Sequence, residues 1–218
     1  SQLIIFGNTE VAQLANYYFS NDSAYEVVAF TVDEQYISEN VFEGKPVISF
    51  EEIEQDYPPE SCHLFVAMGY SKLNMLREQK FNDCQKKGYR LASYISSKCS
   101  FLTDEHVGKN CFILEDNTIQ PFVKIGDNVT MWSGNHIGHH SKIGSHSFIT
   151  SHVVVSGHCT IGDRSFLGVN SAIADGVQIA EKNIIGAGAV VTKNTSGNQV
   201  IVPARSITLD KSSENISL

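Results

Sequence analysis

An aliphatic residue or methionine returns every six positions through the second half of the chain, without a break. Fifteen consecutive positions keep this spacing, which chance does not explain at the usual frequency of such residues. They are Val107, Ile113, Ile119, Ile125, Met131, Ile137, Ile143, Ile149, Val155, Ile161, Leu167, Ile173, Ile179, Ile185 and Val191. A period of six fits neither an α-helix nor a simple alternating strand, and it is typical of hexapeptide β-solenoids. The pattern predicts one short strand and one turn in each unit.

Three such units form a triangular coil of 18 residues, so residues 18 apart should stack along a prism. The repeating aliphatic side chains then point into a common core, and we expect Ile119 to lie beneath Ile137. The unbroken period predicts five coils, from about Val107 to about Ser196, without a long interrupting loop.

The first half of the chain alternates short apolar runs with helix-like stretches, which is typical of a small parallel sheet with helices on its faces. The expected strands are 2–6, 25–32, 62–68 and 90–95, and the expected helices are 11–19, 50–55 and 71–87, the last capped by Ser71. Glu43 to Pro46 reads as a turn. We therefore predict an α/β domain with a small Rossmann-like sheet over 1–95, a left-handed parallel β-helix over 96–206 and a polar tail over 207–218.

Composition excludes several classes of function. Sixteen Lys and Arg stand against 24 Asp and Glu, so the formal net charge of -8 argues against a nucleic-acid or anionic-lipid surface. The first apolar run is too short for a membrane span or a secretory leader, which predicts a cytoplasmic protein with no membrane partner. After Gly7 the sequence lacks the G-x-G-x-x-G fingerprint, which disfavours a redox enzyme of the Rossmann type.

Four histidines share one phase of the repeat, three residues after the aliphatic position: His140, His146, His152 and His158. This phase lies near the turn of each unit, so we expect these side chains to face outward. Because six residues are one third of a coil, His140, His146 and His152 lie on different sides and cannot share a metal within one subunit. Only His140 and His158 should stack. No metal is expected, although a trimer could bring histidines of neighbouring subunits together.

The hexapeptide pattern over about 95–205 resembles the hexapeptide-repeat acyltransferases, which fold as left-handed parallel β-helices, usually trimerise, and use acyl-CoA or acyl-carrier protein. With an α/β domain in front, the chain is similar to the sialic-acid O-acetyltransferase type family. That family includes bacterial N-acetyltransferases acting on UDP- or dTDP-linked 4-amino-sugars. The resemblance implies acetyl-CoA as co-substrate, a nucleotide-sugar substrate, a role in surface-glycan biosynthesis and a homotrimer.

The segment from Ser133 to Gly144 carries the closest resemblance, and aligning its Ile143-Gly144 places His139 on the family's catalytic histidine. Imidazole, with an ordinary pKa of about 6.5, suits a base that takes the proton of an attacking amine or hydroxyl. In the relatives a glutamate often follows, whereas this chain has His140. Either His140 orients His139, or an acidic partner comes from elsewhere; His136 is the rival base.

The resemblance also implies two binding sites. The nucleotide sugar would meet the loop after the first strand, the acidic pair after the second and the glycine after the third: Gly7, Asn8, Thr9, Glu10, Asp33, Glu34 and Gly69. Acyl-CoA would lie along the prism between subunits near its C-terminal coils, at Phe148, Gly168, Val169, Gly186, Ala187 and Gly188.

Two other functions stay open at this point. The same base serves an amine or a hydroxyl, so a sugar or sialic acid O-acetyltransferase is the alternative to an N-acetyltransferase. A non-catalytic trimeric scaffold is the second alternative, and the intact histidine segment disfavours it.

Overall fold

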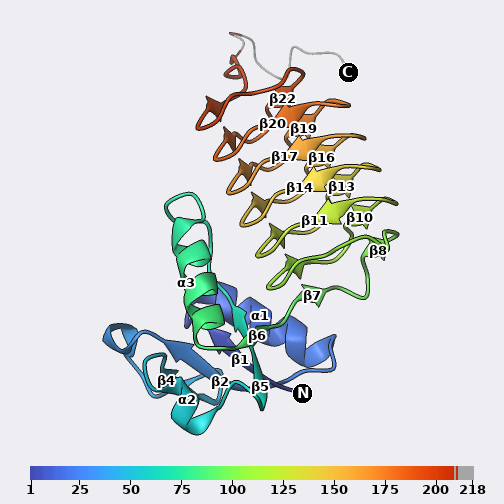
Figure 1. Cartoon of the computed structure of the whole chain (residues 1–218). Helices are drawn as coiled ribbons and strands as arrows, with labels where there is room; N and C mark the ends of the chain where they lie inside the picture. Colours follow the sequence, from blue (N-terminus) through green and yellow to red (C-terminus); the bar gives the residue numbers. More distant parts are fainter. Residues whose placement is uncertain (209, 211–218) are drawn as a thin grey trace.

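The computed structural model describes residues 1–208 and 210, and it shows an α/β domain at one end of a long prism of stacked coils (Figure 1). This arrangement confirms the predicted fold class. The predicted polar tail over 207–218 falls almost entirely outside the described residues. Among the described residues, no helix combines the length and the apolar run needed to cross a lipid bilayer.

The N-terminal domain is built on a six-stranded sheet in the order β3-β4-β2-β1-β5-β6. Its strands are β1 (Gln2–Phe6), β2 (Glu26–Val32), β3 (Val41–Phe42), β4 (Lys45–Ser49), β5 (Cys62–Val66) and β6 (Arg90–Leu91). Its helices are α1 (Glu10–Asn21), the short η1 (Glu34–Tyr36), α2 (Ile53–Asp56) and α3 (Met75–Lys86). All neighbours pair in parallel except β3 with β4. Central β1 buries Leu3 and Ile5 on one face and Ile4 and Phe6 on the other, as expected for a strand covered on both sides.

Three details of this domain differ from the prediction. Strand β4 was missed because its first residues, Lys45-Pro46, read as a turn; the turn is limited to Glu43 and Gly44, which have positive φ. The helix expected to begin near Ser71 begins at Met75, because residues 72–74 have φ between 51° and 63°, a conformation that a right-handed helix excludes. The helix expected over 50–55 is α2, which is shorter.

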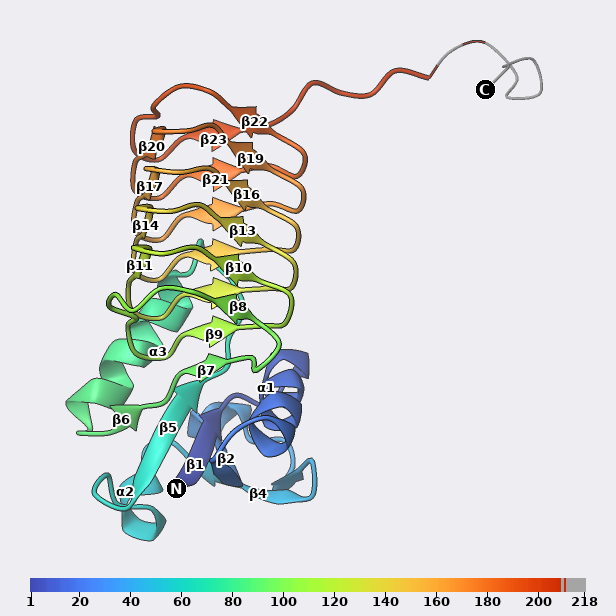
Figure 2. The same cartoon turned by 90° about the vertical axis from the view of Figure 1, so that its right-hand side faces the viewer.

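The prism has three flat sides, which we name face A, face B and face C. Face A consists of β8 (Ser100–Phe101), β10 (Thr118–Ile119), β13 (His136–Ile137), β16 (Val154–Val155), β19 (Ala172–Ile173) and β22 (Val190–Val191). Face B consists of β11 (Lys124–Ile125), β14 (Lys142–Ile143), β17 (Thr160–Ile161) and β20 (Gln178–Ile179). Face C consists of β7 (Tyr94–Ile95), β9 (Phe112–Ile113), β12 (Thr130–Met131), β15 (Phe148–Ile149), β18 (Phe166–Leu167), β21 (Ile184–Ile185) and β23 (Val200–Ile201). Figure 2 shows the coils as stacked rungs.

Each strand residue of one coil pairs in parallel with the residue 18 positions later in the next coil, as Ile137 does with Val155. This confirms the predicted stacking. The repeating aliphatic side chains form one continuous buried core. The stacked strands extend beyond the regular six-residue period at both ends: β7 and β8 precede Val107, which forms only an isolated bridge with Ile125, and β23 follows Val191. Of these, only β7 lies outside the predicted β-helix range of 96–206. The strand expected over 90–95 is thereby divided, because β6 pairs in the N-terminal sheet and β7 in face C.

Helix α3 fastens the N-terminal domain to the prism, beside the corner where face B turns into face C. Arg77, which is 1% exposed, donates hydrogen bonds to the Asn128 carbonyl at 2.7 Å, the Thr130 hydroxyl at 2.8 Å and the Asn74 side-chain oxygen at 3.0 Å. It also donates to the carbonyls of residues 146 and 147, at 3.2 Å each. Burial lowers the pKa of this guanidinium to about 9. One side chain therefore joins two successive coils to the helix.

Candidate active site

A pocket of about 410 Å³ opens at the carboxyl edge of the N-terminal sheet. Five of the predicted substrate-binding residues line it: Gly7, Asn8, Thr9, Asp33 and Gly69. The other two, Glu10 and Glu34, are exposed and do not line it. The pocket therefore gathers the ends of β1, β2 and β5, where parallel sheets commonly bind ligands.

Gly7 shows why the loop after β1 can form the floor of this pocket. Its φ of 132° is a conformation that other residues rarely adopt, and a Cβ there would lie 2.8 Å from the carbonyl oxygen of Ala67. Only glycine lets the loops after β1 and β5 approach this closely. The loop then leads into α1, whose first backbone N–H groups face the same edge of the sheet.

Lys80 is a pocket residue that the sequence reasoning missed. Its ammonium lies 2.6 Å from a carboxylate oxygen of Asp33, and 4.9 Å and 4.7 Å from the ring centres of Phe6 and Phe50. It comes from α3, which folds back over the sheet edge, and its position in sequence gives no sign of that. The pair supplies one cation and one hydrogen-bond acceptor at the pocket wall.

The histidines gather at a different place, the corner where face A turns into face B. His140 and His158 stack with ring centres 4.9 Å apart and planes 16° apart, which confirms the predicted pairing. Phe122 continues the column below, 4.6 Å from His140. All three residues have φ near +60° and occupy the same turn position in successive coils, so the backbone fixes their Cα atoms in line.

His139 folds back against this column. Its Nδ1 lies 3.1 Å from Nδ1 of His140, so one of these nitrogens donates a hydrogen bond to the other. Its main-chain N–H donates to the side-chain oxygen of Gln120 at 2.9 Å. The exposed ring keeps Nε2 without a hydrogen-bond partner in the described part of the chain. His140 thus holds the orientation of an exposed imidazole whose second nitrogen makes no hydrogen bond within the described residues.

Gly157 and Asp175 complete the surroundings of His139. A Cβ at Gly157 would lie 2.9 Å from Cε1 and 3.1 Å from Nε2 of His139, and 3.1 Å from a carboxylate oxygen of Asp175. The imidazole therefore rests over the bare glycine backbone, and the carboxylate of the next coil approaches the same space. The sequence left open whether His140 or an acidic residue from elsewhere orients His139; the structure pairs His139 with His140, and Asp175 is a nearby carboxylate that the sequence reasoning did not name.

The rival base and the predicted CoA residues lie apart from His139. His136 is a half-buried residue of face A. Five of the CoA residues share the corner where face C turns into face A: Gly168, Val169, Gly186, Ala187 and Gly188. The two glycine-bearing turns stack, with the Gly188 N–H donating to the Val169 carbonyl at 2.8 Å. Phe148 is elsewhere: it is 2% exposed and packs under Tyr70, with ring centres 5.0 Å apart, so it belongs to the domain contact.

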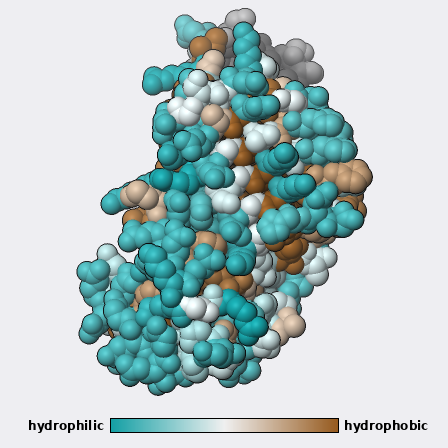
Figure 3. Space-filling model, viewed as in Figure 1, coloured by the Kyte–Doolittle hydropathy of each residue, from teal (hydrophilic) through white to brown (hydrophobic). Residues whose placement is uncertain are grey.

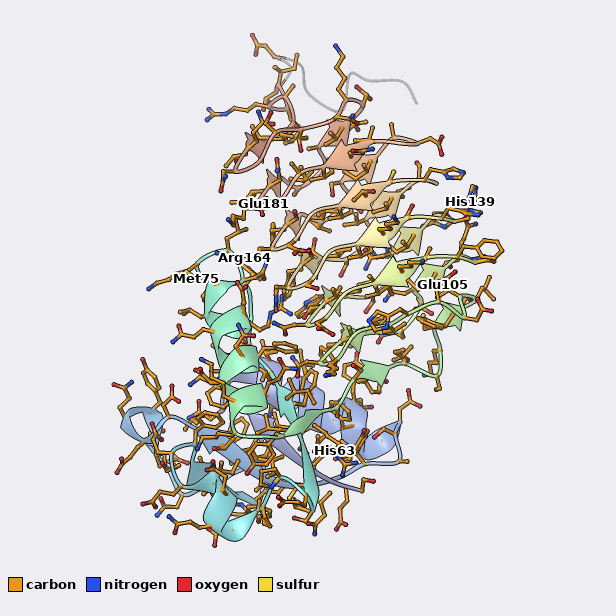
Figure 4. All side chains as sticks on the ribbon, in the orientation of Figure 1. His63, Met75, Glu105, His139, Arg164 and Glu181 are labelled. Atoms are coloured by element: carbon orange, nitrogen blue, oxygen red, sulfur yellow. The ribbon has the colours of Figure 1, made fainter. Side chains whose placement is uncertain are left out.

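Within one chain, the pocket and the histidine corner are not next to each other. The pocket wall includes Ser71 and Lys80, on and beside α3. Figure 4 shows His139 at the edge of the prism away from Met75 and Arg164, which mark the first turn of α3 and the corner beside it. A ligand in the pocket of one chain therefore does not face His139 of that chain.

Comparison with known proteins identifies the repeat and the fold. The family described as "Bacterial transferase hexapeptide (six repeats)" matches residues 158–193. No curated protein sequence is similar enough to the chain to count as a match.

Solved structures resemble nearly the whole chain. The acetyltransferase domain of PglB from Neisseria gonorrhoeae has a TM-score of 0.82 at 18% identity, covering 93% of this chain and 96% of that one. PerB from Caulobacter crescentus, in complex with CoA and GDP-perosamine, has a TM-score of 0.81 at 21% identity, covering 93% and 94%. WeeI from Acinetobacter baumannii has a TM-score of 0.61 at 17% identity, covering 93% and 97%. At these identities the likeness establishes a shared two-domain fold.

Proposed function

We propose that this protein is an acetyl-CoA-dependent acetyltransferase that acts on a nucleotide-linked amino-sugar in glycan biosynthesis. The observation that carries the proposal is His139, an exposed imidazole at a corner of a hexapeptide prism, oriented through Nδ1 and open at Nε2. The pocket at the edge of the N-terminal sheet supports a nucleotide-sugar substrate. The structural neighbours PglB and PerB, described as an acetyltransferase domain and as a complex with CoA and GDP-perosamine, support the same reading.

The chemistry is a direct transfer. The sugar amine attacks the thioester carbonyl carbon of acetyl-CoA, and His139 Nε2 accepts the proton that the amine gives up. The tetrahedral intermediate then collapses, the carbon–sulfur bond breaks, and the proton on His139 passes to the leaving thiolate. His140 holds the ring during both transfers, and the carboxylate of Asp175 favours the transient imidazolium.

We assign the nucleotide sugar to the pocket, with the phosphates at the loop from Gly7 to Thr9 and the ribose near Asp33. Lys80 beside Asp33 adds a positive charge that favours a phosphorylated ligand. We assign acetyl-CoA to the stacked turns that contain Gly168 and Gly188. A Cβ at exposed Gly188 would meet nothing within 4 Å, so the surface there is open to a ligand, whereas buried Gly168 makes room for the backbone of the next coil. Both substrates are cytoplasmic metabolites, so we place the reaction in the cytoplasm.

A homotrimer would bring these sites together. Face A is the side best suited to a second copy: its outward positions carry no Lys, Arg, Asp or Glu, whereas face B carries Lys124 and Lys142, and part of face C is covered by Tyr70. The outward positions of face A are Ser100, Thr118, His136, Val154, Ala172 and Val190. Val154 and Val190, on face A, are 42% and 68% exposed. Figure 3 shows face B instead, where a narrow apolar strip runs between polar side chains. Packing a neighbour on face A buries these valines and lays its histidine corner against another chain's glycine turns.

The test is thiol release from acetyl-CoA with a panel of UDP-, dTDP- and GDP-linked amino-sugars and their hydroxyl counterparts. We expect turnover with at least one amino-sugar, and loss of turnover in His139→Asn. His136→Asn is the matched control, because it removes the rival base and should retain turnover. Turnover on hydroxyl sugars alone would change the assignment to O-acetylation. No turnover on any member, with a folded trimer, would favour a scaffold.

A further inference from the structure

Three histidines of one chain meet at the corner between face A and face B. Each of His139, His140 and His158 offers a ring nitrogen, and these nitrogens all lie within 4.8 Å of one another. All three side chains are exposed. We propose that they form a binding site for a divalent transition metal of the Zn²⁺ class, and that the bound ion switches off the transferase.

The spacing suits such an ion. A tetrahedral Zn²⁺ with metal–nitrogen bonds of about 2.1 Å sets its ligand nitrogens about 3.4 Å apart. The Nδ1 atoms of His139 and His140 are already 3.1 Å apart, and the ring of His158 stands 5.0 Å from that of His139. All three side chains are exposed, so their outer torsions can adjust to bring the third nitrogen closer, at the expense of the stacking between His140 and His158.

The backbone prepares the cluster before any ion binds. His140 and His158 are fixed 18 residues apart in the same left-handed turn position, with φ of 59° and 57°. The His158 N–H donates to the His139 carbonyl at 2.9 Å, which joins the two coils at the site itself. Asp175 places a negative charge near His139. Metal binding therefore needs to restrict little further motion of the backbone and side chains. Imidazole is also a preferred ligand of Zn²⁺, Ni²⁺ and Cu²⁺.

The second half of the inference rests on the proposed function. A neutral imidazole has one nitrogen lone pair, and its other nitrogen carries the proton. Whichever nitrogen of His139 the metal takes, the other remains protonated, so the ring can no longer accept the substrate's proton. Metal binding and base catalysis at His139 therefore exclude each other, and the enzyme should be inhibited in proportion to the occupancy of the site.

The binding experiment uses the full chain without an affinity tag, titrated with Zn²⁺ against a chelating indicator dye. The variant is His158→Asn, because asparagine tolerates the left-handed turn that His158 occupies. The matched control is His152→Asn, at the same phase of the repeat but another corner. We expect one tight site per chain, weakened at least about 10-fold in His158→Asn and unchanged in His152→Asn. Equal affinity in all three proteins would overturn the site.

The inhibition experiment measures thiol release against Zn²⁺ concentration, with each protein normalised to its own metal-free rate. Wild type and His152→Asn should lose activity over the range where the site fills, and His158→Asn should need at least about 10-fold more Zn²⁺. Inhibition that ignores His158 would refute the switch. The binding arm needs no substrate, so a chain that binds Zn²⁺ but transfers no acetyl group would contradict the proposed function and leave the metal site standing.

Discussion

Gly157→Ala tests whether the position of the His139 ring matters to the chemistry. The new Cβ would lie 2.9 Å from Cε1 of His139, whereas nonbonded carbons settle at about 3.5–4.0 Å, so the ring must move by about 0.6–1 Å. The ring moves and not the backbone, because Gly157 is held in the stack by its carbonyl, which accepts the Gly176 N–H at 2.9 Å. His139 is exposed and has room to turn away.

The expected cost falls on activity and not on folding. A displacement of about 1 Å at a reacting group can lower the rate about 10²-fold, equivalent to about 2.7 kcal/mol in the activation free energy. Gly157 does not have a positive φ, so alanine fits its backbone and the free energy of unfolding should stay level or rise slightly. The variant should therefore fold as wild type does and turn over about 10²-fold more slowly.

The assay compares kcat/KM for thiol release with the thermal midpoint of each protein. Gly197→Ala is the control, because its Cβ would meet nothing closer than 3.6 Å, and both quantities should match wild type. A fully active Gly157→Ala protein would refute the role given to the His139 ring. A loss of activity that follows a lower thermal midpoint would refute the claim that side chains move and the backbone stays in place.

Three further predictions concern the pocket and the domain contact. Asp33→Ala should raise KM for the nucleotide sugar about 10-fold or more with little change in KM for acetyl-CoA, because it removes both the ribose acceptor and the partner of Lys80; equal changes in both constants would contradict the assignment. Arg77→Met should lower the free energy of unfolding by about 2–4 kcal/mol in denaturant titrations, because several buried oxygens lose their donor, and unchanged stability would contradict the account of α3. Hydrogen bonds from the Ser97 N–H and the Tyr94 hydroxyl lower the pKa of Asp22 from 3.8 to about 2, so its carboxylate stabilises the fold above about pH 4 and this contribution is lost as the pH falls toward 2. Asp22→Asn should flatten that part of the stability profile measured by thermal unfolding, and an unaltered acid limb would count against the contact.

The prism was predictable because its signal is local and repeated. Each coil uses the same positions for core and turn, so the 18-residue arithmetic also gave the stacking of His140 on His158. The N-terminal sheet was predictable in outline, since its strands are continuous apolar runs buried on both faces. Strand β4 was hidden by Pro46, which is tolerated in the strand because pairing with β2 begins only at the next residue, Val47.

The missed parts depend on contacts between distant segments. The left-handed run before Met75 is held by contacts with the prism, such as the Asn74 amide donating to the Ser165 carbonyl at 3.4 Å. Lys80 reaches the pocket only because α3 crosses the sheet edge. Asp175 lies two coils further along the prism than His139, and both side chains point toward Gly157 in the coil between them. The six-residue spacing alone does not specify these side-chain directions.

Because the coils are uniform, each one adds the same length to the prism. Successive coils are spaced like neighbouring strands, about 4.8 Å apart, and His139 lies on the coil that contains β13. Deleting or adding 18 residues below β13 would leave every side chain facing as before while moving the histidine corner by one rung relative to the domain that holds the pocket. The length of the prism can therefore change only in fixed steps, and under the proposed function the number of coils would set how far the bound sugar must extend to reach His139.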